Sequence, residues 1–349
     1  MSLEAWSTLE AKPLNAECEQ KAREHQLRLT KPPGSLGELE TLAVSLASMQ
    51  EVVFPACDQV HISVFAADHG VAARGVSAFP QVVTSQMVLN FAAGGAAISV
   101  LAKQLGADFE VINLGTVAAA DHPDVIDRRI AEQTADFSVT EAMTEEEMLR
   151  AMDVGAEAIG RALSKGAQLF IAGEMGIANT TSASALMAAL LNMSGESVAG
   201  PGTGIGAPAV KRKAELISGA IRYHQSSLTS PLGCLRCLGG FEIAAMVGAY
   251  LQAAHQGIPV LVDGFISSTA AFIACSLCED AKQWMLFAHQ SDEPFHQQIL
   301  SALDVEPLLQ LSMRLGEGSG AALAVNILRS ACELHKQMAT FEGAGVADH

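Results

Sequence analysis

Short runs of β-branched or other apolar residues recur along the chain, and segments with the apolar periodicity of helices separate them. Each run ends in a polar or glycine-rich turn. This alternation predicts an α/β fold built around a parallel sheet. The six predicted strands are 60–67, 109–114, 168–172, 197–199 (the weakest), 258–262 and 285–288.

The turns after these strands carry much of the polar chemistry of the chain. They include Asp68-His69-Gly70, Gly173-Glu174-Met175-Gly176, Asp263-Gly264 and His289-Gln290-Ser291-Asp292. The carboxyl ends of parallel strands meet at one edge of a sheet, where open α/β sheets bind ligands. We therefore expect a binding site at this edge.

Two helices have recognisable start signals. Ser35 and Glu38 form a predicted capping box before an apolar stripe. Thr144 is the predicted N-cap of a second helix, with three glutamates in its first turn and Gly166 just past its end. Its predicted core-facing residues are Met148, Met152, Ile159 and Leu163.

The two ends of the chain differ from its middle, because both read as helices without strands. We expect the first 54 residues and those after about 320 to pack together as a smaller helical domain beside the sheet.

Composition narrows the class of protein. Hydrophobic residues make up 50% of the 349 residues and charged residues 17%, which is typical of a globular α/β protein or a tightly associated oligomer. The net charge of −17 argues against a nucleic-acid or anionic-membrane partner. The N-terminus lacks the apolar core of a signal peptide, and the apolar stretches are interrupted before membrane-spanning length. We expect a cytoplasmic protein.

The seven cysteines include two CxxC pairs, Cys234/Cys237 and Cys275/Cys278. A four-cysteine zinc site is one interpretation, but 37 residues separate the pairs, more than such sites usually have. The odd total of seven favours reduced, buried thiols.

Glu317 is the first candidate for chemistry. It stands in Arg314-Leu315-Gly316-Glu317-Gly318-Ser319-Gly320, just before an apolar helical run. Flanking glycines let the backbone approach a ligand, and the helix start directs free N–H groups towards the loop. Apolar surroundings raise a carboxyl pKa and a helix end lowers it, so a value suited to proton abstraction near neutrality is within reach. A helix-capping glutamate is the alternative.

Two further turns offer polar groups. Glu174 follows a predicted buried strand and precedes Asn179 and Thr180, and such groups are costly to bury unless they meet a partner. The loop 200–206 offers backbone N–H groups, and the basic run 211–213 follows it, which fits a phosphate. A flexible turn before a solvated basic helix is the alternative.

A metal-dependent hydrolase is a more distant interpretation. Asp68, His69, Asp263 and His289 could supply ligands, but no tight metal-binding spacing supports such a site.

Six segments together resemble the nicotinate-nucleotide:dimethylbenzimidazole phosphoribosyltransferase (CobT) family, and they follow the family's order over nearly the whole chain. They are Lys31–Gly37 (KPPGSLG), Ala67–Val71 (ADHGV), Gly173–Thr181 (GEMGIANTT), Leu238–Ala245 (LGGFEIAA), Asp263–Ile266 (DGFI) and Arg314–Leu323 (RLGEGSGAAL).

The resemblance implies a Rossmann-like catalytic domain over 55–319 and a small helical domain from 1–54 and 320–349. It also implies a dimer with the active site near the interface. The implied reaction moves phosphoribose from nicotinate mononucleotide to a cobamide lower-ligand base, forms an α-glycosidic bond and releases nicotinate. The pyridinium leaves as a neutral ring, so no metal or other cofactor is expected.

The same resemblance assigns roles to individual residues. Glu317 matches the general base and Glu174 the group that orients the ribose and stabilises positive charge. The nucleotide contacts implied are Gly176, Asn179, Thr180, Gly202, Gly204, Lys213 and Ser291, the last as a candidate from across the dimer. Pro201 and Gly206 stand where many members have Arg and Asp.

Phe79, Met87 and Met175 match positions that line the base pocket in the family. All three are bulky and apolar, so the chain resembles the phenol- and p-cresol-activating branch, whose members work as pairs of homologous subunits. A benzimidazole acceptor, a homodimer, or a weakly active subunit completing a heterodimer remain open interpretations.

Overall fold

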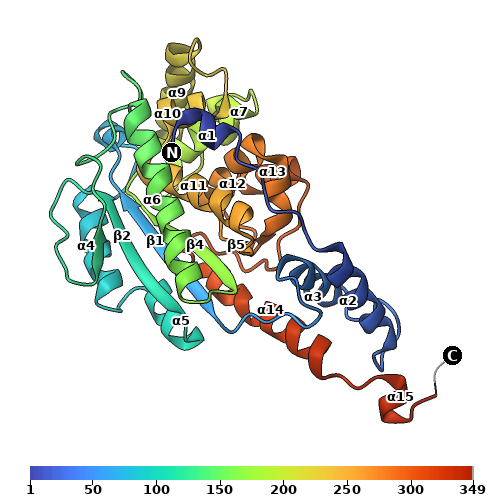
Figure 1. Ribbon diagram of the computed structural model, residues 1–349. Helices are drawn as coiled ribbons and strands as arrows, with labels where there is room; N and C mark the ends of the chain where they lie inside the picture. Colours follow the sequence, from blue (N-terminus) through green and yellow to red (C-terminus); the bar gives the residue numbers. More distant parts are fainter. Residues whose placement is uncertain (348–349) are drawn as a thin grey trace.

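Six parallel strands form one sheet in the order β3-β2-β1-β4-β5-β6 (Figure 1). The structure is a computed structural model and describes residues 1–347. This strand order is that of a Rossmann fold, so the predicted α/β class is confirmed. The strands are β1 Val60–Ala67, β2 Asp108–Gly115, β3 Val125–Asp127, β4 Leu169–Met175, β5 Val260–Val262 and β6 Met285–Phe287.

The sequence predicted five of these strands, and two differences concern short segments. The strand expected at 197–199 was wrong, because these residues belong to the short helix α8 (Gly195–Val198) and its C-cap. The Ser194 side chain accepts a hydrogen bond from the Ser197 N–H and so caps that helix. Strand β3 was missed because three residues at the sheet edge are too few to show a pattern.

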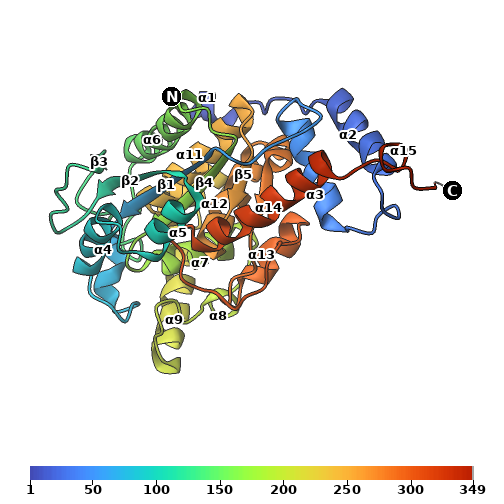
Figure 2. The ribbon, with the colours of Figure 1, turned by 90° about the horizontal axis from the view of Figure 1, so that it is seen from below.

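Helices cover both faces of the sheet (Figure 2). Helices α6 (Glu145–Ser164) and α11 (Phe241–Gln256) lie on one face, and α5 (Ala97–Leu105) and α14 (Ser319–Gln337) lie on the other. Helices α6 and α11 approach so closely that a Cβ added at Gly155 would lie 1.8 Å from the Ala245 carbonyl oxygen.

The two predicted helix starts had different outcomes. Thr144 and Glu147 form the capping box of α6, as predicted for Thr144. Ser35 caps no helix, since α3 (Glu38–Met49) begins after Gly37 and the Leu36 N–H binds the Glu40 side chain instead. Within α6, Met148, Met152 and Ile159 are buried as predicted, but Leu163 is 40% exposed near the end of the helix.

Two helices of the N-terminal end, α2 (Ala16–Arg28) and α3, lie beyond the sheet beside α14 (Figure 1). Helix α3 packs on α2 and on α14, and His25 and Gln26 contact His335 through hydrogen bonds of 2.8 Å. Helix α1 (Leu3–Ser7) lies apart from them, because the N-terminal amine pairs with Asp153 of α6 at 2.6 Å. The division into two domains at 54 and 320 stays a prediction.

The stretch Val82–Leu105 has the length and mean hydropathy, 1.4, of a membrane span. It consists of α4 (Val82–Ala92) and α5, which a turn at Gly94-Gly95 separates. Each helix alone is shorter than the roughly 20 residues that a bilayer requires.

The remaining elements connect the strands and build the walls of the candidate site. They are η1 Gly70–Arg74, α7 Asn179–Leu190, α9 Ala207–His224, α10 Pro231–Leu238, α12 Phe265–Leu277, η2 Glu279–Trp284, α13 His296–Leu303 and α15 Phe341–Ala344.

Candidate active site

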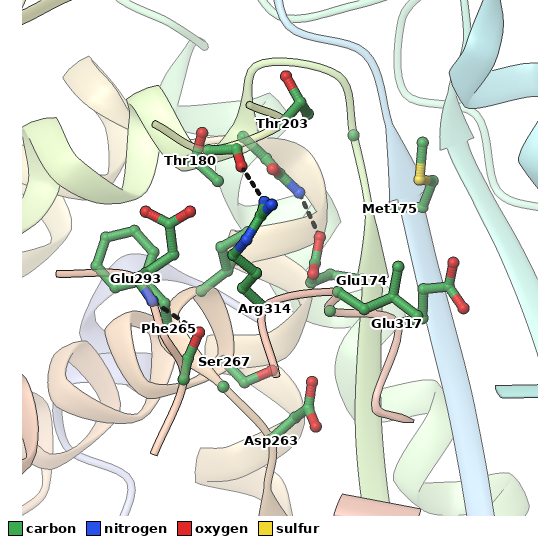
Figure 3. Close-up of a pocket in the computed structure, with 18 of the residues that line it drawn as sticks. Glu174, Met175, Thr180, Thr203, Asp263, Phe265, Ser267, Glu293, Arg314 and Glu317 are labelled. Atoms are coloured by element: carbon green, nitrogen blue, oxygen red, sulfur yellow. Dashed lines mark hydrogen bonds between the residues drawn. The ribbon is translucent and has the colours of Figure 1, made fainter. Parts of the chain in front are cut away.

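A cavity of about 470 Å³ lies at the carboxyl ends of β4, β5 and β6 (Figure 3). Loops after these strands form its floor, and α4, the loop 202–203 and the turn before α14 form its walls. Of the predicted site residues, the lining contains Phe79, Met87, Glu174, Met175, Gly176, Asn179, Thr180, Gly202, Ser291 and Glu317. The structure therefore brings together residues that are up to 238 positions apart, from Phe79 to Glu317.

Glu317 lies in a tight turn with a left-handed backbone, at φ 67°. Gly316 and Gly318 are also left-handed, and a Cβ at Gly173 would lie 2.0 Å from the Glu317 carbonyl oxygen. Strand β4 and the turn are thus in backbone contact, and this contact fixes the position of Glu317.

The Glu317 side chain is 6% exposed, and burial raises its pKa to about 6. The Ile98 N–H at the start of α5, 3.5 Å from the carboxylate, opposes the rise, and the charge of Asp263 adds to it. The helix end that lowers the pKa of Glu317 is therefore the start of α5. The start of α14, which the sequence suggested for this effect, is occupied by another group.

That group is Asp263, at the end of β5. Its carboxylate accepts hydrogen bonds from the Gly318 N–H at 3.2 Å and the Ala321 N–H at 2.8 Å. Asp263 therefore caps α14 and anchors the turn that carries Glu317.

Glu174 is 5% exposed at the end of β4, and the Asn179 amide donates a hydrogen bond to its carboxyl oxygen (Figure 3). Burial raises its pKa to about 8, and the charges of Glu242 and Asp263 add to the rise. In the unliganded protein at neutral pH, Glu174 is thus mostly protonated while Glu317 is mostly ionised. Two carboxyl groups in one cavity are held in different charge states.

A positively charged end of the site forms around Lys213. Its side chain is fully buried, and its ammonium donates to the Thr180 hydroxyl at 3.1 Å and the Gly200 carbonyl at 3.3 Å. Lys211 and Arg212 are exposed, so only the third residue of the basic run is turned inwards. Lys213 and Gly204 lie outside the cavity lining itself.

Phe79, Met87 and Met175 lie together on the lining, as their assignment to one pocket required. Phe79 is 53% exposed and the two methionines are half-buried. Leu315, which is also exposed, joins them. This part of the cavity is apolar and open to solvent.

Several lining residues were missed as site residues. Arg314 belongs to the quoted segment before Glu317, and it donates to the Gly202 carbonyl at 3.2 Å. Glu293 follows Ser291 in the turn after β6. Position after a strand was the available signal for Glu293. Ser291 lines the cavity of its own chain, so no second subunit is needed to bring it there.

The four residues of the metal interpretation do not converge. Asp263 and His289 line the cavity, whereas His69 and Asp68 are outside its lining: the His69 ring lies 2.7 Å from the Glu242 carboxylate, and Asp68 accepts the Val117 N–H. Within residues 1–347, no three His, Cys, Asp or Glu side chains form a group that could hold a metal ion. The CxxC cysteines are free thiols.

Comparisons with known proteins match nearly the whole chain. A family model described as Phosphoribosyltransferase matches residues 11–346. The chain is 52% identical, over 99% of both chains, to the nicotinate-nucleotide–dimethylbenzimidazole phosphoribosyltransferase of Pseudomonas putida KT2440. It is 54% identical, over 96% of both chains, to the enzyme of the same name from Xanthomonas axonopodis pv. citri. The crystal structure of CobT from Thermus thermophilus matches with a TM-score of 0.91 and 42% identity, over 95% of this chain and all of that one.

Proposed function

The chain belongs to the phosphoribosyltransferase family, and from this premise we propose that it transfers the phosphoribosyl group of nicotinate mononucleotide to dimethylbenzimidazole, with release of nicotinate. The observation that carries the proposal is the pair of buried carboxyl groups, Glu174 and Glu317, at one cavity beside the cationic end at Lys213. The names of the relatives at 52% and 54% identity supply the substrates.

Glu317 acts as the general base. A ring nitrogen of the acceptor attacks the anomeric carbon from the α face, and the bond from that carbon to the pyridinium nitrogen breaks. The electron pair of this bond stays with nicotinate, which leaves as a neutral ring. The acceptor's N–H proton passes to the Glu317 carboxylate, whose pKa of about 6 leaves it ionised and available at neutral pH.

Glu174 contacts the ribose. It is protonated in the unliganded protein because its pKa is about 8. The positive charge of the bound pyridinium favours loss of that proton, and the resulting carboxylate stabilises the charge that develops at the anomeric carbon. The Asn179 amide keeps the carboxyl group in place during this change.

The phosphate of the nucleotide lies at the cationic end. The backbone of the loop at Gly202, the Thr180 hydroxyl and the Lys213 ammonium offer donors from three separate segments. Arg314 adds a second positive charge next to Gly202. Gly176, Gly204 and Ser291 complete the set of proposed nucleotide contacts.

A phenolic acceptor is the second candidate for the same reaction. The apolar side chains of Phe79, Met87 and Met175 support it, because they offer no hydrogen-bond partner to a second ring nitrogen. The relatives' names favour dimethylbenzimidazole, and the cavity is open to solvent near Phe79, which is 53% exposed. We therefore place dimethylbenzimidazole first and phenol or p-cresol second.

The test is turnover by the purified chain with nicotinate mononucleotide and either dimethylbenzimidazole or phenol. We expect nicotinate release and the benzimidazole ribotide from this chain alone. Activity that requires a co-expressed homologous subunit would support the heterodimer interpretation. No ribotide under any of these conditions would overturn the proposal.

A further inference from the structure

Glu293 is a buried carboxyl group that the proposed reaction does not use. It follows β6 in the turn before α13, lines the cavity and is 7% exposed. Its backbone N–H donates to the Ser291 hydroxyl at 3.3 Å. A Cβ added at Gly200 would lie 2.4 Å from the Glu293 carboxyl oxygen, so this side chain rests directly on the loop that we assign to the phosphate.

Glu293 lies close enough to both cations of the phosphate end, Lys213 and Arg314, for their charges to act on its pKa. Lys213 comes from α9 and Arg314 from the turn before α14, and Figure 3 shows Arg314 between Glu293 and Glu174. Within the described part of the chain, no carboxylate oxygen lies within 4.0 Å, the limit for an ion pair, of a side-chain nitrogen of Lys213 or Arg314. Glu293 and Arg314 line the cavity and Lys213 lies outside its lining, and within residues 1–347 none of the three charges is neutralised by a direct ion pair.

The charges around this space decide what an entering phosphate needs. Two cations and an ionised Glu293 sum to one positive charge. A phosphate monoester dianion changes the sum to one negative charge; Arg314 is exposed to solvent, but the Glu293 and Lys213 side chains are buried, and excess charge beside buried groups is unfavourable. One proton on Glu293 brings the sum to zero and turns an acceptor-only carboxylate into a hydrogen-bond donor towards a phosphate oxygen.

We propose that Glu293 is the proton-coupled partner of the phosphate: a phosphate monoester dianion enters together with one proton from solvent, and the protonated Glu293 carboxyl then donates a hydrogen bond to it. This inference rests on the proposed function, because it assumes that the nucleotide phosphate lies beside Lys213 and Arg314.

The other titratable groups nearby are compatible with this role. Burial already raises the pKa of Glu293, while the charges of Lys213 and Arg314 and the Gly202 N–H oppose the rise.

His296 is neutral, since its Nδ1 accepts the Ser291 N–H, its Nε2 faces the Ser268 hydroxyl, and burial lowers its pKa to about 3. Asp292 is exposed and its charge adds a small further rise to the pKa of Glu293, and His289 lines the same cavity. Burial lowers the pKa of Lys213 to about 8, with the Glu293 charge opposing, so Lys213 is mostly charged at pH 7.

The test measures proton uptake when ribose 5-phosphate binds, by titration calorimetry at pH 7 in two buffers of different ionisation enthalpy. This probe carries the phosphate but no leaving group, so no turnover occurs. We expect the wild-type chain to take up about one proton for each molecule bound and Glu293→Gln to take up almost none. Asp292→Asn, which neutralises the adjacent exposed carboxylate, is the matched control and should behave like the wild type.

A second measurement follows the affinity for ribose 5-phosphate from pH 6.5 to 8. Wild-type binding should weaken with rising pH by up to about tenfold per unit, and Glu293→Gln should flatten this dependence. Binding without proton uptake by the wild type would overturn the inference, and that result does not depend on whether the variant folds. Weaker binding by Glu293→Gln with unchanged proton uptake would make Glu293 a positioning residue only and would also overturn it.

These outcomes are separate from those of the proposed function. Ribotide formation without proton uptake leaves the transferase intact and removes the role of Glu293. Proton-coupled binding without ribotide formation keeps the role of Glu293 and removes the proposed substrates. Failure of ribose 5-phosphate to bind at all would remove the assignment of the phosphate end, and the inference with it.

Discussion

Glu317 combines a left-handed backbone, close contact with β4 and a carboxylate beside the start of α5. A left-handed conformation is unfavourable for a residue with a side chain, and the surrounding contacts hold it in place. Glu317→Gln keeps the shape of the side chain and removes its ability to accept a proton. We expect normal folding and nucleotide binding but at least about 10²-fold slower turnover, measured by steady-state kinetics.

The pKa of Glu317 also predicts the direction in which activity changes with pH. A base with a pKa of about 6 is ionised above that pH, so kcat/KM should rise with pH through about 6, and at higher pH the proton-coupled phosphate binding inferred above should lower it again. Glu317→Gln should lose the rising limb. A profile that keeps its rising limb in the variant would assign the titration to a different group.

Glu174 affects stability in a way that follows from its raised pKa. Between about pH 4.5 and 8 the folded protein holds a proton that the unfolded chain has lost, so the contribution of this carboxyl to stability falls as pH rises across that window. Glu174→Gln should remove the dependence and raise the free energy of unfolding at pH 8 by on the order of 3 kcal/mol relative to the wild type. Chemical denaturation at pH 5 and pH 8 measures the difference, and an equal effect at both would contradict it.

We expect acceptor choice to depend on single side chains as well. Replacing Phe79, Met87 and Met175 by Ser, Gln and Leu should shift relative efficiency towards benzimidazoles. Each apolar contact contributes about 1–3 kcal/mol, so single and combined variants should form a graded series. Competition assays with phenol and dimethylbenzimidazole measure the ratio. A ratio that stays constant in all the variants would leave these three residues without a role in specificity.

At the scale of elements, the contact between α6 and α11 depends on glycine. Gly155→Ala would place a methyl group 1.8 Å from the Ala245 carbonyl oxygen, so the helices must separate. We expect a loss of about 1–3 kcal/mol in the free energy of unfolding, measured with urea. Gly160→Ala in the same helix meets no atom within 4 Å and should be neutral or stabilising by up to about 1 kcal/mol.

The sequence predicted most elements whose local pattern agreed with their final surroundings. Thr144 and Glu147 cap α6 with their own side chains, and this short-range signal is visible in the sequence. At 197–199 and at Ser35, competing local hydrogen bonds decided the outcome and the pattern was misleading. The predicted site residues mostly follow strands, and the parallel topology gathers them at one edge. The capping of α14 by Asp263 was not predictable, because it joins residues 55 and 58 positions apart across the sheet.

At the scale of the whole molecule, the chemistry should need only the residues of the chain. Exhaustive treatment with EDTA should leave turnover unchanged, because a pyridinium leaving group needs no Lewis acid. Metal analysis before and after treatment is the control. Loss of activity that zinc or magnesium restores would instead favour the metal-dependent interpretation.

Helix α14 joins the first and last parts of the chain to be synthesised. Its first turn follows Glu317 and its last turn holds His335, which contacts His25 and Gln26 of α2. Arg28 ends α2 and Ser319 begins α14, so 291 positions separate them. At roughly 5–20 residues per second, a ribosome needs on the order of 15–60 s to cover that distance. During this interval α14 is not yet available to cover α2 and α3. The apolar surface of these two helices is then open to chaperones and to aggregation until α14 is made and completes the site around Glu317.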